Sequence, residues 1–200
     1  MRAETAMTKG EVTRQHIIEK AAPVFNQRGF SGCSMQDLME ATGLEKGGIY
    51  RHFASKEELA VAAFRYAMQQ TVAARIVDLE KVTGAIPRLM HVVKAFVEIP
   101  SPVPGGCPLL NVAAYAESGC DGVQAQAKEA MAAWKARLLG ILEDGIASGE
   151  LRGDVDARRT ANAVISMLEG SLVICRIEGT KQARRDAQET LEVLLGGLAA

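Results

Sequence analysis

The sequence predicts an all-α fold, in which three short helices over about residues 10–55 are joined to a larger helical domain over residues 56–200. The residues that dominate the composition, Ala, Leu, Glu, Arg and Met, favour helix, and alternating runs of β-branched residues do not occur. Apolar residues recur at intervals of three and four along most of the chain. Glycine turns and serine-led capping sequences divide the chain into segments of helical length.

The composition indicates a folded globular protein, and the overall charge gives no sign of a nucleic-acid partner. Hydrophobic residues make up 48% of the 200 residues and charged residues 24%, so a core can be buried and general disorder is excluded. The formal net charge is −1. Any contact with nucleic acid must therefore be made by a local patch of charge.

The cysteines, the N-terminus and the apolar stretches together predict a cytoplasmic protein. Cys33, Cys107, Cys120 and Cys175 match no zinc spacing, and no pair of histidines accompanies them. The first ten residues lack the apolar segment of a signal peptide, and the apolar stretches are shorter or more interrupted than the ~20 residues that span a bilayer. We therefore expect reduced thiols, no membrane contact and no cofactor.

The first predicted helix covers about residues 11–28. Gly29 follows it as a left-handed stop. Pro23 lies inside the helix, where proline removes a hydrogen bond, so we expect a bend near this residue. The apolar residues at helical spacing, which form one face, are Ile17, Ile18, Ala21, Ala22 and Phe25.

Two short helices separated by a glycine turn are predicted over residues 34–53. The first begins with a capping-box pattern, in which Ser34 is the N-cap and Asp37 lies in the first turn. It ends where Gly43 allows a sharp turn. The second covers about residues 45–52.

The rest of the chain is predicted to form six more helices. A second capping box, Ser55-Lys56-Glu57-Glu58, begins a long helix. No helix can cross the segment 100–106, which is rich in proline and glycine. The other five helical segments cover about residues 84–98, 108–118, 121–148, 156–178 and 182–198.

The spacing of the two short helices is that of a helix-turn-helix, which favours binding to double-stranded DNA. An α-helix fits the major groove, and the preceding helix braces it across the backbone. Gly47 and Gly48 have no bulky side chains, so the second helix can approach the duplex closely. Each feature also occurs in ordinary surface helices and loops. The groups that add hydrogen-bond donors or positive charge are Lys46, Tyr50, Arg51 and His52.

An ordered series of residues runs through this region. Its members are Thr13-Arg14, Ile17-Ile18, Ala21, Phe25, Gly29-Phe30, Ser34-Met35, Asp37-Leu38, Ala41, Gly43-Leu44, Lys46-Gly47, Ile49-Tyr50, His52-Phe53, Lys56 and Leu59. The series resembles the TetR family of bacterial transcriptional repressors over about residues 11–60. Two residues depart from the family's pattern. Pro23 is unusual in the first helix, and Glu45 either caps the following helix or accepts a hydrogen bond from a cytosine amine.

The resemblance implies a homodimeric repressor that binds a palindromic operator and is released by a small-molecule effector or by cysteine modification. Each subunit would join an N-terminal DNA-binding domain to a C-terminal domain that binds the effector and dimerises. The residues implied to face base edges are Lys46, Gly47, Gly48 and Arg51. Those implied to contact phosphates are Ser34, Tyr50, His52 and Lys56.

A mixed set of apolar and polar residues favours a small-molecule site in the C-terminal region, for a mainly apolar or electrophilic effector. Any one of them can also be an ordinary core residue. The set consists of Phe96, Cys107, Asn111, Tyr115, Trp134, Met167 and Cys175.

Cys107 is the predicted sensor thiol within this set. It precedes Pro108, a favoured first helical residue, and the helix dipole there lowers the pKa of a thiol. Cys120, ahead of Asp121, is placed similarly. The sequence around Cys107 also resembles that of family members that sense electrophiles or oxidants. The alternative is a small buried side chain.

The last two helices are expected to form the dimer interface, with packing inside one subunit as the alternative. Their apolar faces carry Ala163, Met167, Gly170, Leu172, Ile174, Leu191, Val193, Leu194 and Leu198.

Two other classes of protein remain open as alternatives, an all-helical enzyme and an adaptor that binds only protein. The three histidines are scattered, and no nucleophile elbow or phosphate loop is present, so the sequence offers no chemistry to an enzyme. A DNA-binding measurement separates the adaptor from a regulator.

Overall fold

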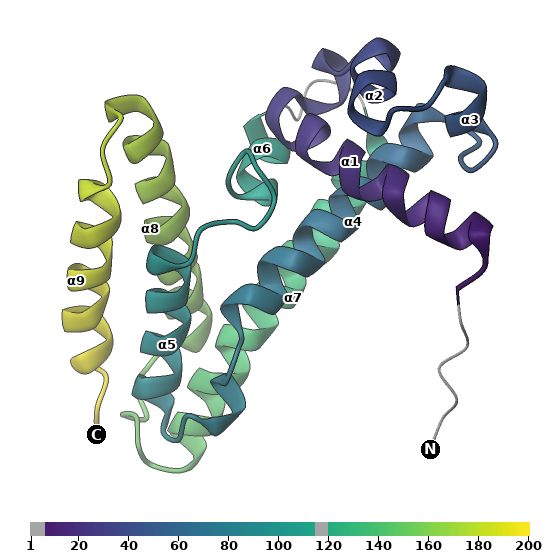
Figure 1. Ribbon diagram of the computed structural model, residues 1–200. Helices are drawn as coiled ribbons and strands as arrows, with labels where there is room; N and C mark the ends of the chain where they lie inside the picture. Colours follow the sequence, from purple (N-terminus) through teal and green to yellow (C-terminus); the bar gives the residue numbers. More distant parts are fainter. Residues whose placement is uncertain (1–6, 115–119) are drawn as a thin grey trace. The chain divides into compact units, whose positions relative to one another are not determined.

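The computed structural model describes residues 7–114 and 120–200, and these are almost entirely helical (Figure 1). No β-strand occurs within these ranges; the one isolated antiparallel bridge pairs Leu151 with Ala199. The predicted all-α fold is therefore confirmed.

The chain divides into two compact units, each built from two stretches of sequence. The first unit comprises Met1–Thr71 and Ser101–Glu129, and the second comprises Val72–Pro100 and Ala130–Ala200. These units are defined by packing and do not follow the expected boundary between residues 55 and 56. The functional division at that boundary stays a prediction.

The first unit holds the N-terminal helices together with a later part of the chain. Its buried apolar cluster joins α1 to α4 and includes Ile17, Leu38, Ile49, Phe53 and Leu59. Its helices are α1 (Lys9–Gly32), α2 (Met35–Thr42), α3 (Lys46–Tyr50), most of α4 (Lys56–Arg75), α6 (Pro108–Ala114) and the start of α7 (Asp121–Ala147).

The backbone of α1 breaks at Gly29 rather than at Pro23. Gly29 has φ 70° and ψ 177° and is the one non-helical residue inside α1, so the bend expected near Pro23 is not found in the dihedral angles. The proline ring fixes φ near a helical value, and only one hydrogen bond is lost there. A positive φ, by contrast, is easily adopted only by glycine.

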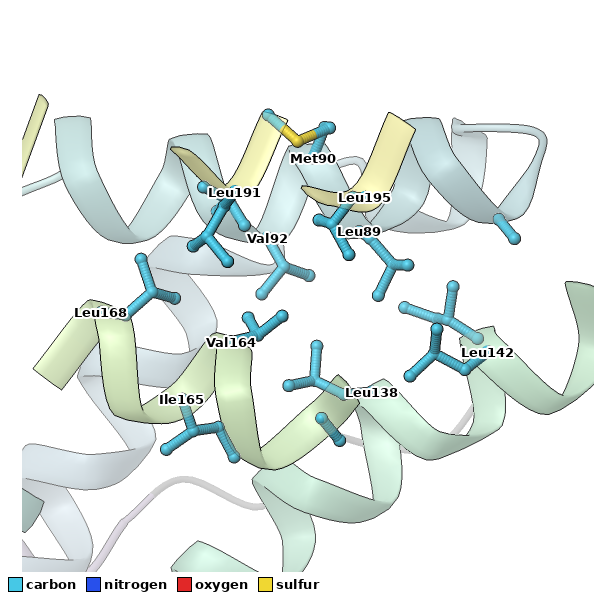
Figure 2. Packing of buried hydrophobic residues seen from close by; sticks show 14 of the residues in the cluster. Leu89, Met90, Val92, Leu138, Leu142, Val164, Ile165, Leu168, Leu191 and Leu195 are labelled. Atoms are coloured by element: carbon cyan, nitrogen blue, oxygen red, sulfur yellow. The ribbon is translucent and has the colours of Figure 1, made fainter. Parts of the chain in front are cut away.

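The second unit is built around one large apolar cluster (Figure 2). Leu191 and Leu195 of α9 face Leu89 and Val92 of α5, and all four are buried. Each buried leucine stabilises the fold by roughly 1.5–3 kcal/mol. The elements of the unit are the short 3-10 helix η1 (Leu79–Lys81), α5 (Ala85–Glu98), the rest of α7, α8 (Ala157–Glu178) and α9 (Gln182–Gly196).

The helices expected after the first sixty residues agree with the structure. Four of the five begin and end within two residues of the predicted bounds. The helix expected over 108–118 is described only to Ala114, because residues 115–119 lie outside the described part of the chain.

Among the described residues, α8 is the one helix long and apolar enough to cross a membrane by length and composition. The expectation that no stretch reaches this length was wrong for α8. Val164, Ile165 and Leu168 explain part of its apolar character, because they lie in the core of the second unit. Ile174 and Ile177, nearer its end, are exposed.

Candidate nucleic-acid interface

α2 and α3 form a helix-turn-helix whose first helix is fixed by a capping box. The Ser34 hydroxyl accepts a hydrogen bond from the Asp37 amide at 3.1 Å, and the Ser34 amide donates to the Asp37 carboxylate at 2.8 Å. The amide and hydroxyl of Ser34, which both donate to this carboxylate, hold the pKa of Asp37 below its usual value. The turn contains Gly43 at φ 69° and ψ 20°, a left-handed conformation that favours glycine.

α3 is short and is held by two buried anchors, Ile49 and Phe53, each only 1% exposed. The Arg14 guanidinium from α1 lies 4.5 Å from the centre of the Phe53 ring and forms an ion pair of 3.4 Å with Glu58 of α4. Glu58 also accepts a hydrogen bond from the Ala54 amide at 2.7 Å. These contacts fix α3 against α1 and the start of α4.

The surface of α3 presents the residues implied to contact DNA. A β-carbon added to Gly47 would have no atom of another residue within 4 Å, whereas one added to Gly48 would lie 3.5 Å from the Leu44 side chain. The Lys46 ammonium lies 5.9 Å from the centre of the Tyr50 ring. Of the eight predicted residues, Ser34, Lys46, Gly47, Tyr50 and Arg51 are exposed, and Gly48, His52 and Lys56 are half-buried.

Lys56 also has a structural partner. Its ammonium donates a hydrogen bond to the Phe30 carbonyl at 2.6 Å and lies 4.4 Å from the centre of the Phe30 ring. A lysine ammonium has three N–H donors, so a phosphate can still be bound beside this carbonyl. The predicted role in DNA binding is joined here by a role in holding the end of α1 against α4.

Glu45 occupies the N-cap position of α3, but its side chain makes no capping hydrogen bond there. Of the two roles open from the sequence, capping is therefore limited to the position of the residue. The contact with a cytosine amine stays a hypothesis.

Sequence reasoning missed the polar contacts that connect the helices around α3. Arg28 of α1 forms an ion pair with Asp37 of α2, and the His16 ring lies 3.2 Å from the Thr42 carbonyl oxygen through Nε2. The partners of Arg14, His16 and Arg28 come from other helices, and no local pattern pairs them.

The residues predicted to bind the effector are divided between the two units. The rings of Phe96 and Trp134 stack with centroids 5.6 Å apart, and Met167 packs against the same apolar cluster. Cys175 is half-buried on α8. Tyr115 lies outside the described residues. Among the described members of the set, Cys107 and Asn111 belong to the first unit, and the set stays a prediction.

The thiols near helix starts differ from the expectation in one respect. Burial, with the nearby Glu57 carboxylate, raises the pKa of Cys120 although it lies at the start of α7. The expected lowering was therefore wrong for Cys120. Cys107 is buried directly before α6, where its backbone carbonyl accepts a hydrogen bond from the backbone amide of Asn111 at 3.2 Å.

The sequence patterns of two protein families match separate parts of this chain. The pattern of the bacterial regulatory proteins of the tetR family matches residues 17–63. A second, of the tetracyclin repressor-like C-terminal domain, matches residues 85–191, which is more than half of the chain.

Individual proteins of this kind are similar over most of their length. The HTH-type transcriptional repressor DhaR of Mycobacterium sp. (strain GP1) is 26% identical over 84% of this chain and 85% of its own. KstR2 of Mycolicibacterium smegmatis, also an HTH-type transcriptional repressor, is 23% identical over 92% and 90%. The crystal structure of a TetR-family transcriptional regulator from Cytophaga hutchinsonii is 35% identical, with a TM-score of 0.90 over 98% of this chain and 99% of that chain.

Proposed function

The chain belongs to the TetR family of bacterial transcriptional regulators, and from this premise we propose that it is a homodimeric repressor that an effector releases from an inverted-repeat operator. The observation that supports this most is the solvent-facing surface of α3, which buried Ile49 and Phe53 hold in place. Family membership also removes the enzyme alternative. The cytoplasm is the compartment in which such a repressor meets DNA.

The proposed docking places α3 in the major groove. Lys46 and Arg51 carry positive charge on an exposed surface, and a bidentate arginine contact to guanine is worth about 1–3 kcal/mol of discrimination. Tyr50, His52 and Lys56 would contact phosphates, which set position without reading sequence. Ser34 serves first as a helix cap, because its hydroxyl also donates to Asp37 at 2.8 Å.

The proposed dimer interface lies on α8 and α9. Ile177 is 80% exposed and Val193 is 79% exposed, and Val173, Ile174 and Leu194 are also exposed. Large exposed apolar side chains gathered on two helices that contact each other suit an interface with a second subunit. Leu191, by contrast, is fully buried inside the subunit, so the alternative of intramolecular packing holds for that residue. Two-fold symmetry then requires an operator with two related half-sites.

Effector control requires two states that differ in affinity for the operator. An effector releases the repressor only if it has a higher affinity for the state that does not bind the operator than for the state that does. A thiol-modifying effector stays open as a trigger, and Cys107 is its predicted target. Because Cys107 is only 3% exposed, such a reagent would need the start of α6 to open.

Selection of bound sequences from a random duplex pool tests the proposal. We expect the purified chain to select an inverted repeat. The mass of the protein–DNA complex at physiological salt should correspond to two subunits on one duplex. Recovery of no common sequence would contradict the repressor assignment and would favour the adaptor. For the thiol trigger, Cys107→Ser should abolish release by an electrophile such as N-ethylmaleimide, and unchanged release would remove that idea.

A further inference from the structure

The first unit contains a cavity that the sequence did not predict. It is lined by residues of α1, α4, α6 and the start of α7, all within this unit, it is partly open to solvent, and its volume is about 60 Å³. Figure 1 shows α6 beside α1, and the two helices are in contact. Representative lining residues are Phe25 of α1, Ala63 and Phe64 of α4, Val112 of α6 and Val123 of α7.

The cavity arises from small residues placed between aromatic ones. Ala60, Ala63 and Ala67 repeat along one side of α4, each at most 2% exposed, and Ala22 faces the cavity from α1. Alanine ends at its β-carbon, so these positions fill little of the space beside Phe25 and Phe64, which also line the cavity. Protein interiors are close-packed, and an unfilled void loses dispersion contacts. A cavity with this lining therefore favours an occupant.

Two buried asparagines, Asn26 and Asn111, belong to the polar part of the lining, together with Cys120 and Gln124. The Asn111 side-chain amide donates to the Asn26 backbone carbonyl at 2.8 Å and to the Gly105 carbonyl at 3.0 Å. The Asn26 amide in turn donates to the Pro104 carbonyl at 2.9 Å and the Gly106 carbonyl at 3.2 Å. This network joins α1, the segment 101–106 and α6 at the edge of the cavity.

The chemistry of the lining limits what can bind. None of the described residues that line the cavity carries a formal charge. Cys120 contributes a thiol that burial keeps protonated by raising its pKa. Because an ion would lose its hydration without gaining a charged partner among these residues, the lining favours an uncharged ligand.

We propose that this cavity is the effector site, and that the effector is a small, uncharged, mainly apolar molecule of one ring or a short chain. The proposal rests on the proposed function, because an effector has meaning only for a regulator. It differs from the set expected from the sequence, because Asn111 is the one described member of that set that lines the cavity.

The lining connects the occupant directly to the helix-turn-helix. Phe30 of α1 faces the cavity, and its carbonyl accepts the hydrogen bond from Lys56 at the start of α4. Arg28, two residues earlier, forms the ion pair with Asp37 of α2. A molecule that needs more room than the empty cavity offers would favour a state in which α1 has moved relative to α6. That state would hold α2 and α3 differently.

Neutral and charged probes with the same ring test the site. Titration of the full-length protein with benzyl alcohol should shift the NMR signals of cavity residues saturably, and benzoate should bind about tenfold or more weakly. Ala63→Leu fills the interior of the cavity and Val112→Phe fills its rim, and each should weaken benzyl alcohol binding about tenfold or more. The matched controls Ala132→Leu and Val77→Phe, at exposed positions of the second unit, should leave binding unchanged.

Circular dichroism shows which filled variants fold, and Val112→Phe at the half-buried rim remains informative if Ala63→Leu unfolds. Absence of saturable binding to the wild type, or equal binding by a folded filled variant, would overturn the cavity site. Operator affinity measured on the same samples separates the two proposals. A wild type without operator binding removes the repressor function, whereas operator binding that bound benzyl alcohol leaves unchanged removes only the effector role.

Discussion

Each unit of this chain contains a buried apolar cluster, but the two units differ in the contacts that accompany it. In the first, directional polar contacts connect separate helices: Arg14 with Glu58, Arg28 with Asp37, Lys56 with the Phe30 carbonyl, and Asn111 with Asn26. In the second, one continuous apolar cluster fills the space between α5, α7, α8 and α9. Directional contacts add to the apolar anchors Ile49 and Phe53 in fixing where α3 lies, whereas the cluster of the second unit mainly stabilises its fold.

The second difference is that the first unit contains the cavity. Its lining combines alanines with Asn26 and Asn111, so an occupant would contact the two residues whose hydrogen bonds connect α1 to α6. We therefore expect stability to depend mainly on the second unit, and control of DNA binding to depend on the first. Changes in the second unit should alter stability without altering sequence preference, and changes in the first unit should alter DNA binding at smaller cost in stability.

The largest expected effect is loss of stability from the core of the second unit. Leu138→Ala removes a fully buried side chain and should destabilise the protein by about 2–5 kcal/mol, measured by urea unfolding. The exposed Val77→Ala should change stability by less than about 0.5 kcal/mol. Operator preference of the folded fraction should be unchanged for Leu138→Ala. A changed operator preference would contradict the expectation that the second unit affects stability alone.

The next effect concerns the asparagine network. Asn111→Ala leaves buried acceptors of α1 and the segment 101–106 without their donor, and should cost about 1–3 kcal/mol of stability. Unlike Leu138→Ala, it should also weaken operator binding, because it loosens α1. Anisotropy titration of folded protein measures this, with the half-buried Asn162→Ala as control. Wild-type operator affinity in Asn111→Ala would show that the network only stabilises.

A smaller effect is expected from Lys56→Ala. Removal of one phosphate contact should weaken binding to all duplexes similarly and reduce the slope of log affinity against log salt by about 1. The exposed Lys94→Ala in the second unit should leave the slope unchanged. If both variants retain the wild-type slope, Lys56 serves only to hold the Phe30 carbonyl.

The smallest effect is on the dependence of stability on pH. The pKa of Asp37 is lower in the folded than in the unfolded chain, so its stabilising contribution is complete above the unfolded value near 3.8 and is lost as pH falls through the folded value. Asp37→Asn should therefore make the acid side of the stability curve shallower below about pH 4. Thermal unfolding between pH 2 and 6 measures this, and an unchanged acid slope would contradict the capping role.

Local signals in the sequence predicted most of the fold, because they depend on neighbouring residues. Ser34 and Asp37 are three residues apart, and Gly43 alone permits the left-handed turn that ends α2. The same reasoning failed at Pro23, whose fixed φ is compatible with a helix. It also overestimated the helix dipole at Cys120, where burial outweighs it.

The contacts that define the cavity could not be predicted in this way. Asn26 and Asn111 are 85 residues apart, and Arg14 and Glu58 are 44 apart, so their pairing depends on how distant helices pack. The one sequence feature that indicated a buried polar contact was Asn26, which lies next to Phe25 on an apolar face. A buried polar residue on such a face requires a partner, but the sequence does not name it.

The most direct test of the account is whether α3 reads DNA sequence. Anisotropy titrations at physiological salt should compare the selected inverted repeat with a scrambled duplex of the same composition. The wild type should prefer the inverted repeat by on the order of 10³-fold or more, and Arg51→Ala should lose about 1–3 kcal/mol of that discrimination. Equal affinity of the wild type for both duplexes, with and without a neutral effector, would contradict the account.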